Sequence, residues 1–175
     1  MPAEFVWYDA VEGTELQQGD LLRDCAAPVH HTALTPAAAQ TPIHVDVWDV
    51  IVMTQSCDLV GKKATRVMLC PTWRMKAFLE SFPAEQRKDK RNKLGSDSLL
   101  SYHVLNPCTL KGLECEHLVV DFANAFSVDR EYADELAGKN SPRVRLQPPY
   151  REYVAQGFAR FFMRVGLPIV RVPIP

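Results

Sequence analysis

The stretch IHVDVWDVIVMT, residues 43–54, shows the clearest strand pattern in the chain. In its first half Ile43, Val45 and Val47 alternate with polar or larger residues, which is typical of a strand with one face on a core. Its second half, 50–53, is continuously apolar, as in a strand covered on both faces. A second strand predicted at 65–70 begins about ten residues later, so we expect the two strands to form a hairpin.

Shorter strands are predicted where brief apolar runs are bounded by turn-forming residues. They cover residues 5–8, 21–25, 98–105, 117–122 and 143–146. We expect residues 26–42 and 55–63 to be loops. Helices are predicted for 72–82, for a segment from Pro83 through Lys93 that ends near Gly95, and for 129–137.

The last predicted helix, about 149–165, has the most regular pattern of all. Pro148 and Pro149 precede it, and Gly166 ends it, which is the usual arrangement of proline before a helix and glycine after it. Its apolar residues recur every three or four positions, so they form one stripe that should pack on a sheet. The stripe consists of Tyr150, Val154, Phe158, Phe161 and Val165. Gly157 predicts a close approach by another backbone.

Together these elements predict one α+β domain over residues 1–175. We expect a small, mostly antiparallel, SH3-like β-barrel built from about 5–71 and 98–146. A helical insertion would occupy about 72–95, and the C-terminal helix would pack across the barrel.

Composition narrows the function classes only a little. The net charge of −1 and the 47% hydrophobic content are ordinary for a globular protein. No run approaches 18 apolar residues, so no membrane span is predicted. The first residues resemble no signal peptide, and the five cysteines are irregularly spaced, so we expect reduced thiols and a cytoplasmic location.

Three short segments within residues 19–72 resemble the SH3-type small β-barrel of the MazF/PemK toxin family. The segments are Gly19-Asp20-Leu21-Leu22, Val50-Ile51-Val52-Met53-Thr54 and Val67-Met68-Leu69-Cys70-Pro71-Thr72. The resemblance implies a small barrel and, if it extends to activity, a ribonuclease. Trp48-Asp49 stands where that family has Arg-Pro, and no segment matches its catalytic arginine loop.

The polar loop Thr54-Gln55-Ser56-Cys57-Asp58 directly follows the predicted buried strand. Such a position is common for functional residues, because the strand holds the loop in place. Cys57 could act as a nucleophile with Asp58 beside it, a histidine as base and Gln55 as a binding group. Alternatively the loop is a tight turn, with Ser56 and Asp58 bonded to the backbone and Cys57 packed inward.

A zinc site is a further possibility, although no cofactor is favoured. Cys115 and His117 would lie on one face of a strand, and Cys108 and Cys57 could complete four ligands. The spacing matches no standard zinc motif, so buried free thiols remain the alternative.

Arginine without lysine marks the last part of the chain. From residue 143 onward the basic residues are all arginines, with Glu152 as the one acid, and the candidate binding residues are Arg143, Arg145, Arg151, Arg160 and Arg164. Arginine favours bidentate partners such as phosphate or carboxylate. These arginines could bind nucleic acid or a protein, or could pair internally with Asp46, Asp49, Asp58 or Asp121.

The favoured function is therefore a non-catalytic binding or adaptor module for a protein or nucleic-acid partner. A barrel-type ribonuclease and a Cys57-dependent hydrolase or transferase are the alternatives. The basic run 87–93 would add to a phosphate-tracking surface if it shares a side with the C-terminal arginines.

Overall fold

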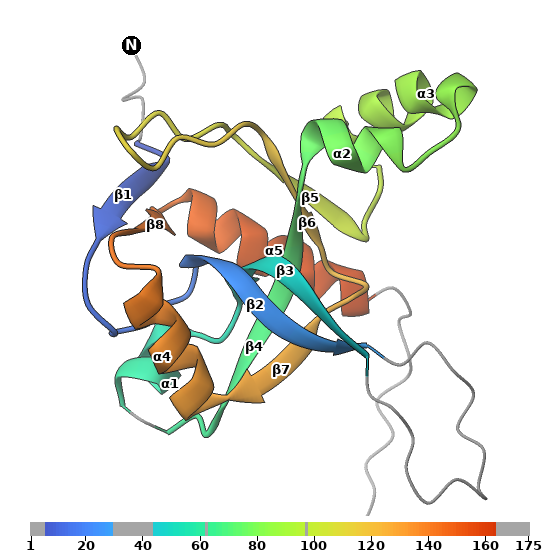
Figure 1. Cartoon of the computed structure of the whole chain (residues 1–175). Coiled ribbons are helices and arrows are strands. Elements are labelled where there is room, and N and C mark those ends of the chain that lie inside the picture. The colour runs from blue at the N-terminus through green and yellow to red at the C-terminus, as the bar shows by residue number, and fades with distance from the viewer. Residues whose placement is uncertain (1–5, 30–43, 62, 97, 164–175) are drawn as a thin grey trace, which may run out of the picture.

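The computed structural model describes residues 6–29, 44–61, 63–96 and 98–163, and within them it is an α+β structure of mostly antiparallel sheets (Figure 1). In chain order its eight strands and five helices are β1 (Tyr8–Val11), β2 (Leu21–Val29), β3 (His44–Val52), α1 (Ser56–Val60), β4 (Arg66–Arg74), α2 (Met75–Glu80), α3 (Ala84–Gly95), β5 (Tyr102–Leu105), β6 (Leu118–Asp121), β7 (Phe126–Asp129), α4 (Arg130–Lys139), β8 (Arg143–Leu146) and α5 (Tyr150–Phe162).

Strand β4 is the centre of the larger sheet, whose order is β2-β3-β4-β6-β5 with β7 also paired to β4. The predicted hairpin is confirmed, because β3 pairs antiparallel to β4 with Ile51 opposite Cys70. On its other side β4 pairs with β7 through Arg66–Leu69 and with β6 through 72–74. Strands β1 and β8 form a separate two-stranded sheet. The described sheets do not close into a barrel.

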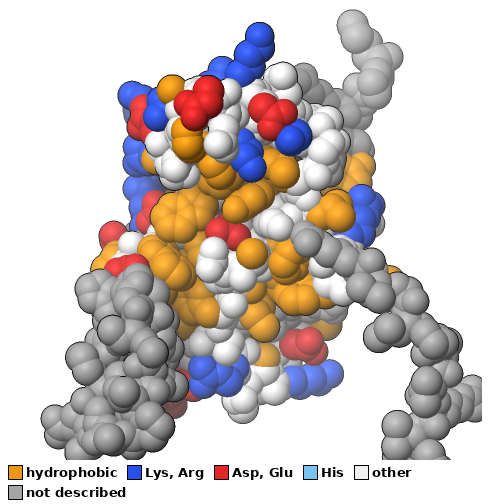
Figure 2. All heavy atoms as spheres, turned by 90° about the vertical axis from the view of Figure 1, so that its right-hand side faces the viewer, with side chains coloured by type: hydrophobic (Ala, Val, Ile, Leu, Met, Phe, Trp, Pro, Cys, Tyr) orange, Lys and Arg blue, Asp and Glu red, His pale blue; other side chains and the backbone are white. Residues whose placement is uncertain are grey.

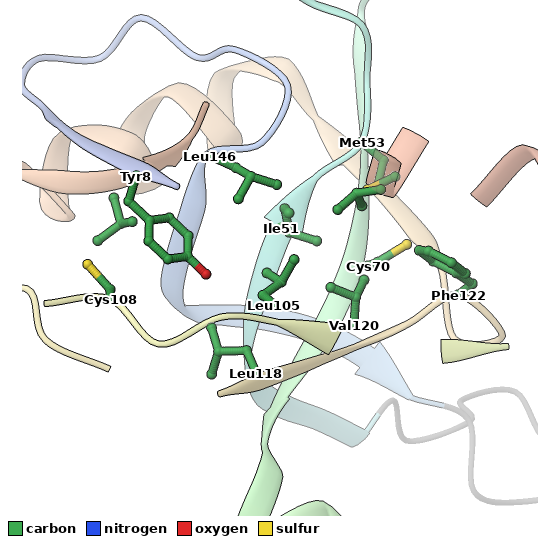
Figure 3. Packing of buried hydrophobic residues seen from close by; sticks show 12 residues of the cluster. Tyr8, Ile51, Met53, Cys70, Leu105, Cys108, Leu118, Val120, Phe122 and Leu146 are labelled. Atoms are coloured by element: carbon green, nitrogen blue, oxygen red, sulfur yellow. The ribbon is translucent and has the colours of Figure 1, made fainter. Parts of the chain in front are cut away.

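The core lies on both faces of this sheet. On one face Ile51, Cys70, Val120 and Phe122 meet residues of β1, β8 and α5 (Figure 3). On the other face, α4 packs Ala133, Leu136 and Ala137 into a cluster that includes Val50 and Val52. Helices α2 and α3 enclose a third, smaller cluster against β5. Helices α2, α4 and α5 each contribute two or more buried or partly buried residues to these clusters, whereas α1 and α3 contribute one each.

Helix α5 confirms the predicted apolar stripe within the described residues. Val154 is buried, and Tyr150, Phe158 and Phe161 are partly buried against the same cluster, whereas Val165 lies outside the described residues. Gly157 was expected to allow a close approach by another backbone, and this was wrong, because the group that lies close to it is the Phe122 ring. A Cβ at Gly157 would lie 3.2 Å from Cε2 of Phe122.

Several predicted boundaries are wrong, and in each case long-range pairing explains the difference. Strand β2 continues to Val29 because its second half pairs with β3, so residues 26–29 of the predicted loop at 26–42 are strand, and residues 30–42 lie outside the described residues. Strand β4 runs to Arg74 because it pairs with β6, so the helix predicted at 72–82 begins at Met75. Strand β7 was not predicted, and the expected loop at 55–63 contains the short helix α1.

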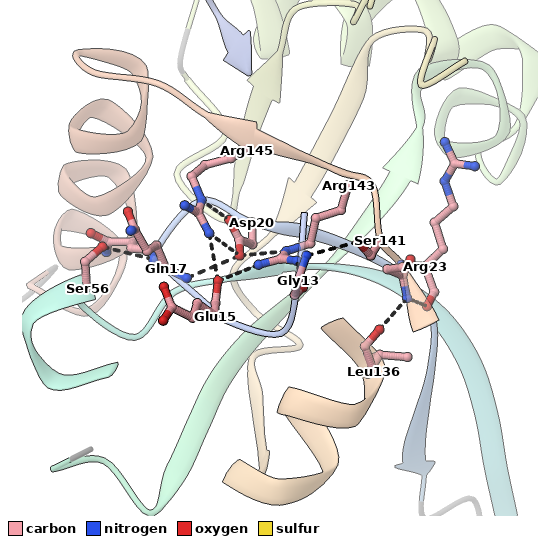
Figure 4. A network of polar contacts seen from close by, with 12 residues as sticks. Gly13, Glu15, Gln17, Asp20, Arg23, Ser56, Leu136, Ser141, Arg143 and Arg145 are labelled. Atoms are coloured by element: carbon pink, nitrogen blue, oxygen red, sulfur yellow. Dashed lines mark hydrogen bonds and ion pairs between the residues drawn. The ribbon is translucent and has the colours of Figure 1, made fainter. Parts of the chain in front are cut away.

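A buried carboxylate joins the two sheets. Asp20 is 0% exposed at the start of β2, and its carboxylate accepts hydrogen bonds from Nε of Arg143 at 2.9 Å and from both Nε and Nη2 of Arg145. The backbone N–H of Gln17 donates to the same carboxylate at 3.2 Å. We call Asp20, Arg143 and Arg145 the Asp20 network (Figure 4).

The Asp20 network also fixes the loop before β2. Arg143 Nη1 donates to the carbonyl oxygen of Gly13, and Arg143 Nη2 and Arg145 Nη2 donate to that of Glu15. Gly19 precedes Asp20 with φ +88, a conformation that favours glycine, and its carbonyl accepts from the Leu146 N–H at 2.9 Å. Arg143 and Arg145 thus pair with Asp20 and not with the acids that the sequence had suggested, which were Asp46, Asp49, Asp58 and Asp121.

We predict that Asp20→Asn lowers the free energy of unfolding by about 3 kcal/mol or more, because it leaves a buried guanidinium without its counter-charge. Urea unfolding followed by circular dichroism measures this. Asp129→Asn is the matched control, since Asp129 pairs with Arg66 in an exposed ion pair that contributes about 1 kcal/mol or less. Equal unfolding midpoints for the two variants would contradict the structural role of Asp20.

Candidate functional site

The C-terminal arginines divide into an internal and an external group. Arg143 and Arg145 are occupied by the Asp20 network, so internal pairing describes both of them. Arg151 is partly buried and donates to Oε1 of its neighbour Glu152 at 2.9 Å. Arg160 is exposed, and its contact is a hydrogen bond of 3.4 Å to Oε1 of Gln156. Arg164 lies outside the described residues.

The polar segment after β3 has a structural role at two of its positions. The Thr54 hydroxyl accepts from the Met68 N–H at 2.7 Å, and the Ser56 hydroxyl accepts from the Gln18 N–H at 3.1 Å. Gln55 is the N-cap residue of α1. These bonds fix the segment between β4 and the loop that leads to Asp20.

Cys57 lies on α1 and is exposed, so the expectation that it packs inward as a small apolar residue was wrong. Its thiol donates to Oε1 of Gln55 at 3.7 Å and to Oδ1 of Asp58 at 3.8 Å. Neither contact is an imidazole, which is the usual base for a catalytic thiol.

The four residues considered for zinc are not brought together. Among the described residues, no three of the side chains of histidine, cysteine, aspartate and glutamate are grouped so that they could hold a metal. Cys108 and Cys115 do face each other across an antiparallel bridge, with backbone hydrogen bonds of 2.9 and 3.0 Å. Both are free thiols, and Cys57 and His117 do not join them in a group of ligands.

Burial keeps the thiols of Cys25 and Cys70 protonated. It raises the pKa of Cys25 to about 11 and that of Cys70 to about 12, with the Asp121 carboxylate adding to the effect on Cys70. It also raises the pKa of Cys115. Because the thiolate is the reactive form, Cys25 and Cys70 are poor nucleophiles at neutral pH in the folded protein.

A groove between β5 and α5 gathers the exposed face of the C-terminal helix with residues from the sheet. Its volume is about 310 Å³, and we call it the β5–α5 groove. Its lining consists of Leu100, Tyr102, His103, Phe122, Tyr153, Gln156, Gly157 and Arg160. Half of its lining residues therefore carry rings, and an amide and a guanidinium lie on the helix side.

Packing holds the base of the groove in place. Phe122 is 1% exposed and contacts the Phe158 ring edge-on, with the ring centroids 5.5 Å apart. The His103 ring stacks on Phe122 with an interplanar angle of 29°. Gly157 allows α5 to approach Phe122 this closely, because a side chain there would crowd the ring.

The accessible side chains of the groove are aromatic and polar, with the aliphatic Leu100 among them. Tyr153 is 53% exposed, and Arg160 lies two turns further along the same helix. Burial, together with the Asp121 carboxylate, raises the pKa of Tyr102, so its hydroxyl remains a hydrogen-bond donor at neutral pH. No carboxylate lines the groove.

The sequence identified the helix side of this groove but not the sheet side. Arg160 was a candidate binding residue, and helical spacing puts Tyr153 and Gln156 near the same side of α5. Tyr102 and His103 come from a strand some fifty residues earlier, and nothing in the local pattern points to them.

The comparisons with known proteins give no match, either to a family model or to a curated protein. Within the part of the chain that the structure describes, no helix combines the length and the apolar character needed to cross a bilayer.

We predict that iodoacetamide at pH 8 modifies Cys57 of the folded protein well before Cys25 and Cys70, because Cys57 is exposed whereas burial shields the other two and raises their pKa. Peptide mass spectrometry after timed quenching measures the order. In concentrated urea all five cysteines should react at similar rates. Modification of Cys70 as fast as Cys57 in the folded protein would show that this core is open.

Proposed function

We propose that this protein is a non-catalytic binding module that holds single-stranded nucleic acid in the β5–α5 groove. The observation that supports this most is the position of Arg160. Its guanidinium lies beside a set of aromatic rings and forms no ion pair with an acid among the described residues. Stacking surfaces next to an available guanidinium are the combination that single-stranded nucleic acids require.

The rings of the groove supply the base-binding half of such a site. Tyr153 is half exposed at its rim, and Tyr102 lies across from it on β5. Stacking of a base on an aromatic ring contributes about 1–3 kcal/mol and tolerates any base. Gln156 offers an amide donor and acceptor beside these rings.

Basic residues near the groove supply the phosphate-binding half. Helix α3 has five basic residues against two acidic ones, and its Leu94 packs in the same cluster as Tyr102. Strand β5 therefore has the basic helix α3 on one side and Arg160 of α5 on the other. Figure 2 shows Lys and Arg side chains on the upper part of one face, above a broad region of apolar side chains. A strand of phosphates could follow this path.

The lining of the groove favours binding over catalysis. Cleavage of a phosphodiester commonly uses an acid and a base beside the scissile bond, and the groove has one histidine and no carboxylate. A toxin-like ribonuclease is the alternative to this proposal. A cytoplasmic location is part of the proposal, since nucleic acid is present there and thiols stay reduced.

We predict that fluorescence anisotropy detects binding of labelled single-stranded RNA or DNA, and that binding weakens from about 50 to 200 mM salt as counterions are released. Arg160→Gln should weaken binding and reduce the salt slope by about one phosphate contact. Tyr153→Ala should weaken binding about tenfold through lost stacking, with little change in the salt slope.

Arg66→Gln is the matched control, because it also removes one exposed arginine but lies on the end of β4 that pairs with β7. It should bind as the unmodified protein does. Absence of binding at both salt concentrations, or equal loss in Arg66→Gln and Arg160→Gln, would overturn the proposal. If the protein cleaves the labelled strand and Arg160→Gln abolishes that cleavage, the ribonuclease function replaces the binding proposal.

A further inference from the structure

A second and larger cavity lies away from the β5–α5 groove and shares no lining residue with it. Its volume is about 530 Å³, which is within the range of small-molecule sites. It is bounded by β2, β3 and β4, by helix α4 and by the loop 112–115. We call it the charged cavity, because six side chains of both signs, none part of the Asp20 network, line it.

Three cations of the charged cavity are not paired with any acid among the described residues. Arg23, Arg74 and Lys139 line it, and none of them forms an ion pair within the described part of the chain. In Figure 4 the Arg23 guanidinium extends away from the Asp20 network, and no dashed line reaches it. Arg143 also lines the cavity, but Asp20 occupies its guanidinium.

Two of these cations converge on one place. Thr72 and Arg74 are two residues apart on β4, so their side chains share a face, and both line the cavity. Arg23 reaches the cavity from β2, on the far side of β3. Cys115 lines the same cavity, and its pKa is raised by burial while Arg23 and Arg74 both act to lower it. No carboxylate is among the groups that shift the pKa of Cys115.

The acids of the charged cavity are Asp24, Asp49 and Glu114, and they too form no ion pair within the described residues. Asp24 lies in a β-bulge of β2, with φ 57, which is uncommon for a residue other than glycine. Its backbone N–H donates to Oδ1 of Asp49 at 3.2 Å, so the bulge holds the Asp49 carboxylate against the backbone of Asp24. Bulges often redirect a side chain next to a site.

We propose that the charged cavity binds a small zwitterion of the amino-acid or short-peptide class. Its carboxylate is held by Arg23 and Arg74, and its ammonium group by Asp24 and Asp49. A carboxylate suits the planar guanidinium fork. A ligand with charges of both signs satisfies both halves of the cavity, whereas a dianion such as phosphate would face three carboxylates and a polyamine would face three cations.

The test uses the full chain and measures its thermal midpoint with each of the twenty L-amino acids and with glycylglycine, followed by calorimetry on any probe that raises it. Ligands that bind the folded state raise the midpoint by mass action. Each positive probe is compared with its N-acetyl form, which lacks the ammonium group, and its amide, which lacks the carboxylate. Inorganic phosphate is the anion control.

We expect at least one zwitterion to raise the midpoint, and both blocked forms of it to lose at least tenfold in affinity. Arg74→Gln and Asp49→Asn should each abolish the shift, and Asn keeps the acceptor for the Asp24 N–H. Arg66→Gln, an exposed arginine at the other end of β4, should leave it unchanged.

The proposal is overturned if no probe shifts the unmodified protein, or if blocked forms or phosphate bind as tightly as the zwitterion. It is also overturned if Arg74→Gln retains full binding. Nucleic-acid binding is measured on the same variants, and because the two sites share no residue, either proposal can fail while the other holds.

Discussion

The burial of the Asp20 carboxylate between two arginines is the constraint on which the rest of the structure depends. An ionised carboxylate that is 0% exposed is costly unless its charge and its lone pairs are satisfied. Arg143 and Arg145 supply both, and their remaining N–H groups bond the carbonyls of Gly13 and Glu15. The two-stranded sheet, the loop before β2 and the six-stranded sheet are therefore fixed relative to one another by one group of charges.

This arrangement also determines which arginines can meet a ligand. The first two of the arginine-rich segment point inward because β8 lies beside Asp20. Helix α5 then turns its apolar stripe to the core through Val154, so Tyr153 and Arg160 are left on its outer face. The same basic composition thus gives internal ion pairs in β8 and an exposed arginine on α5. A count of arginines along the sequence does not distinguish these two uses.

The two candidate sites differ in chemistry because they lie on different parts of the sheet. The β5–α5 groove is aromatic, has a lone guanidinium and no carboxylate, and lies at the β5 edge. The charged cavity extends from β2, at the opposite edge, to β4, and balances cations against acids. A module with both could hold an extended strand at one edge while a small molecule occupies the other, and β4 connects them through its pairing with β3 and β6.

The sequence by itself determined the hairpin of β3 and β4 and the apolar stripe of α5, because both are patterns within a short window. It also determined the helix that begins after Pro83, because proline favours the start of a helix. Four-residue β7 is too short for such a pattern, and the ends of β2 and β4 depend on which strands they pair with. The tertiary structure alone decided that Asp20 pairs with arginines 123 and 125 residues away, and that β5 meets α5. A local pattern records which face of an element is apolar, but it does not record the distant element that this face will contact, and both candidate sites arise at such contacts.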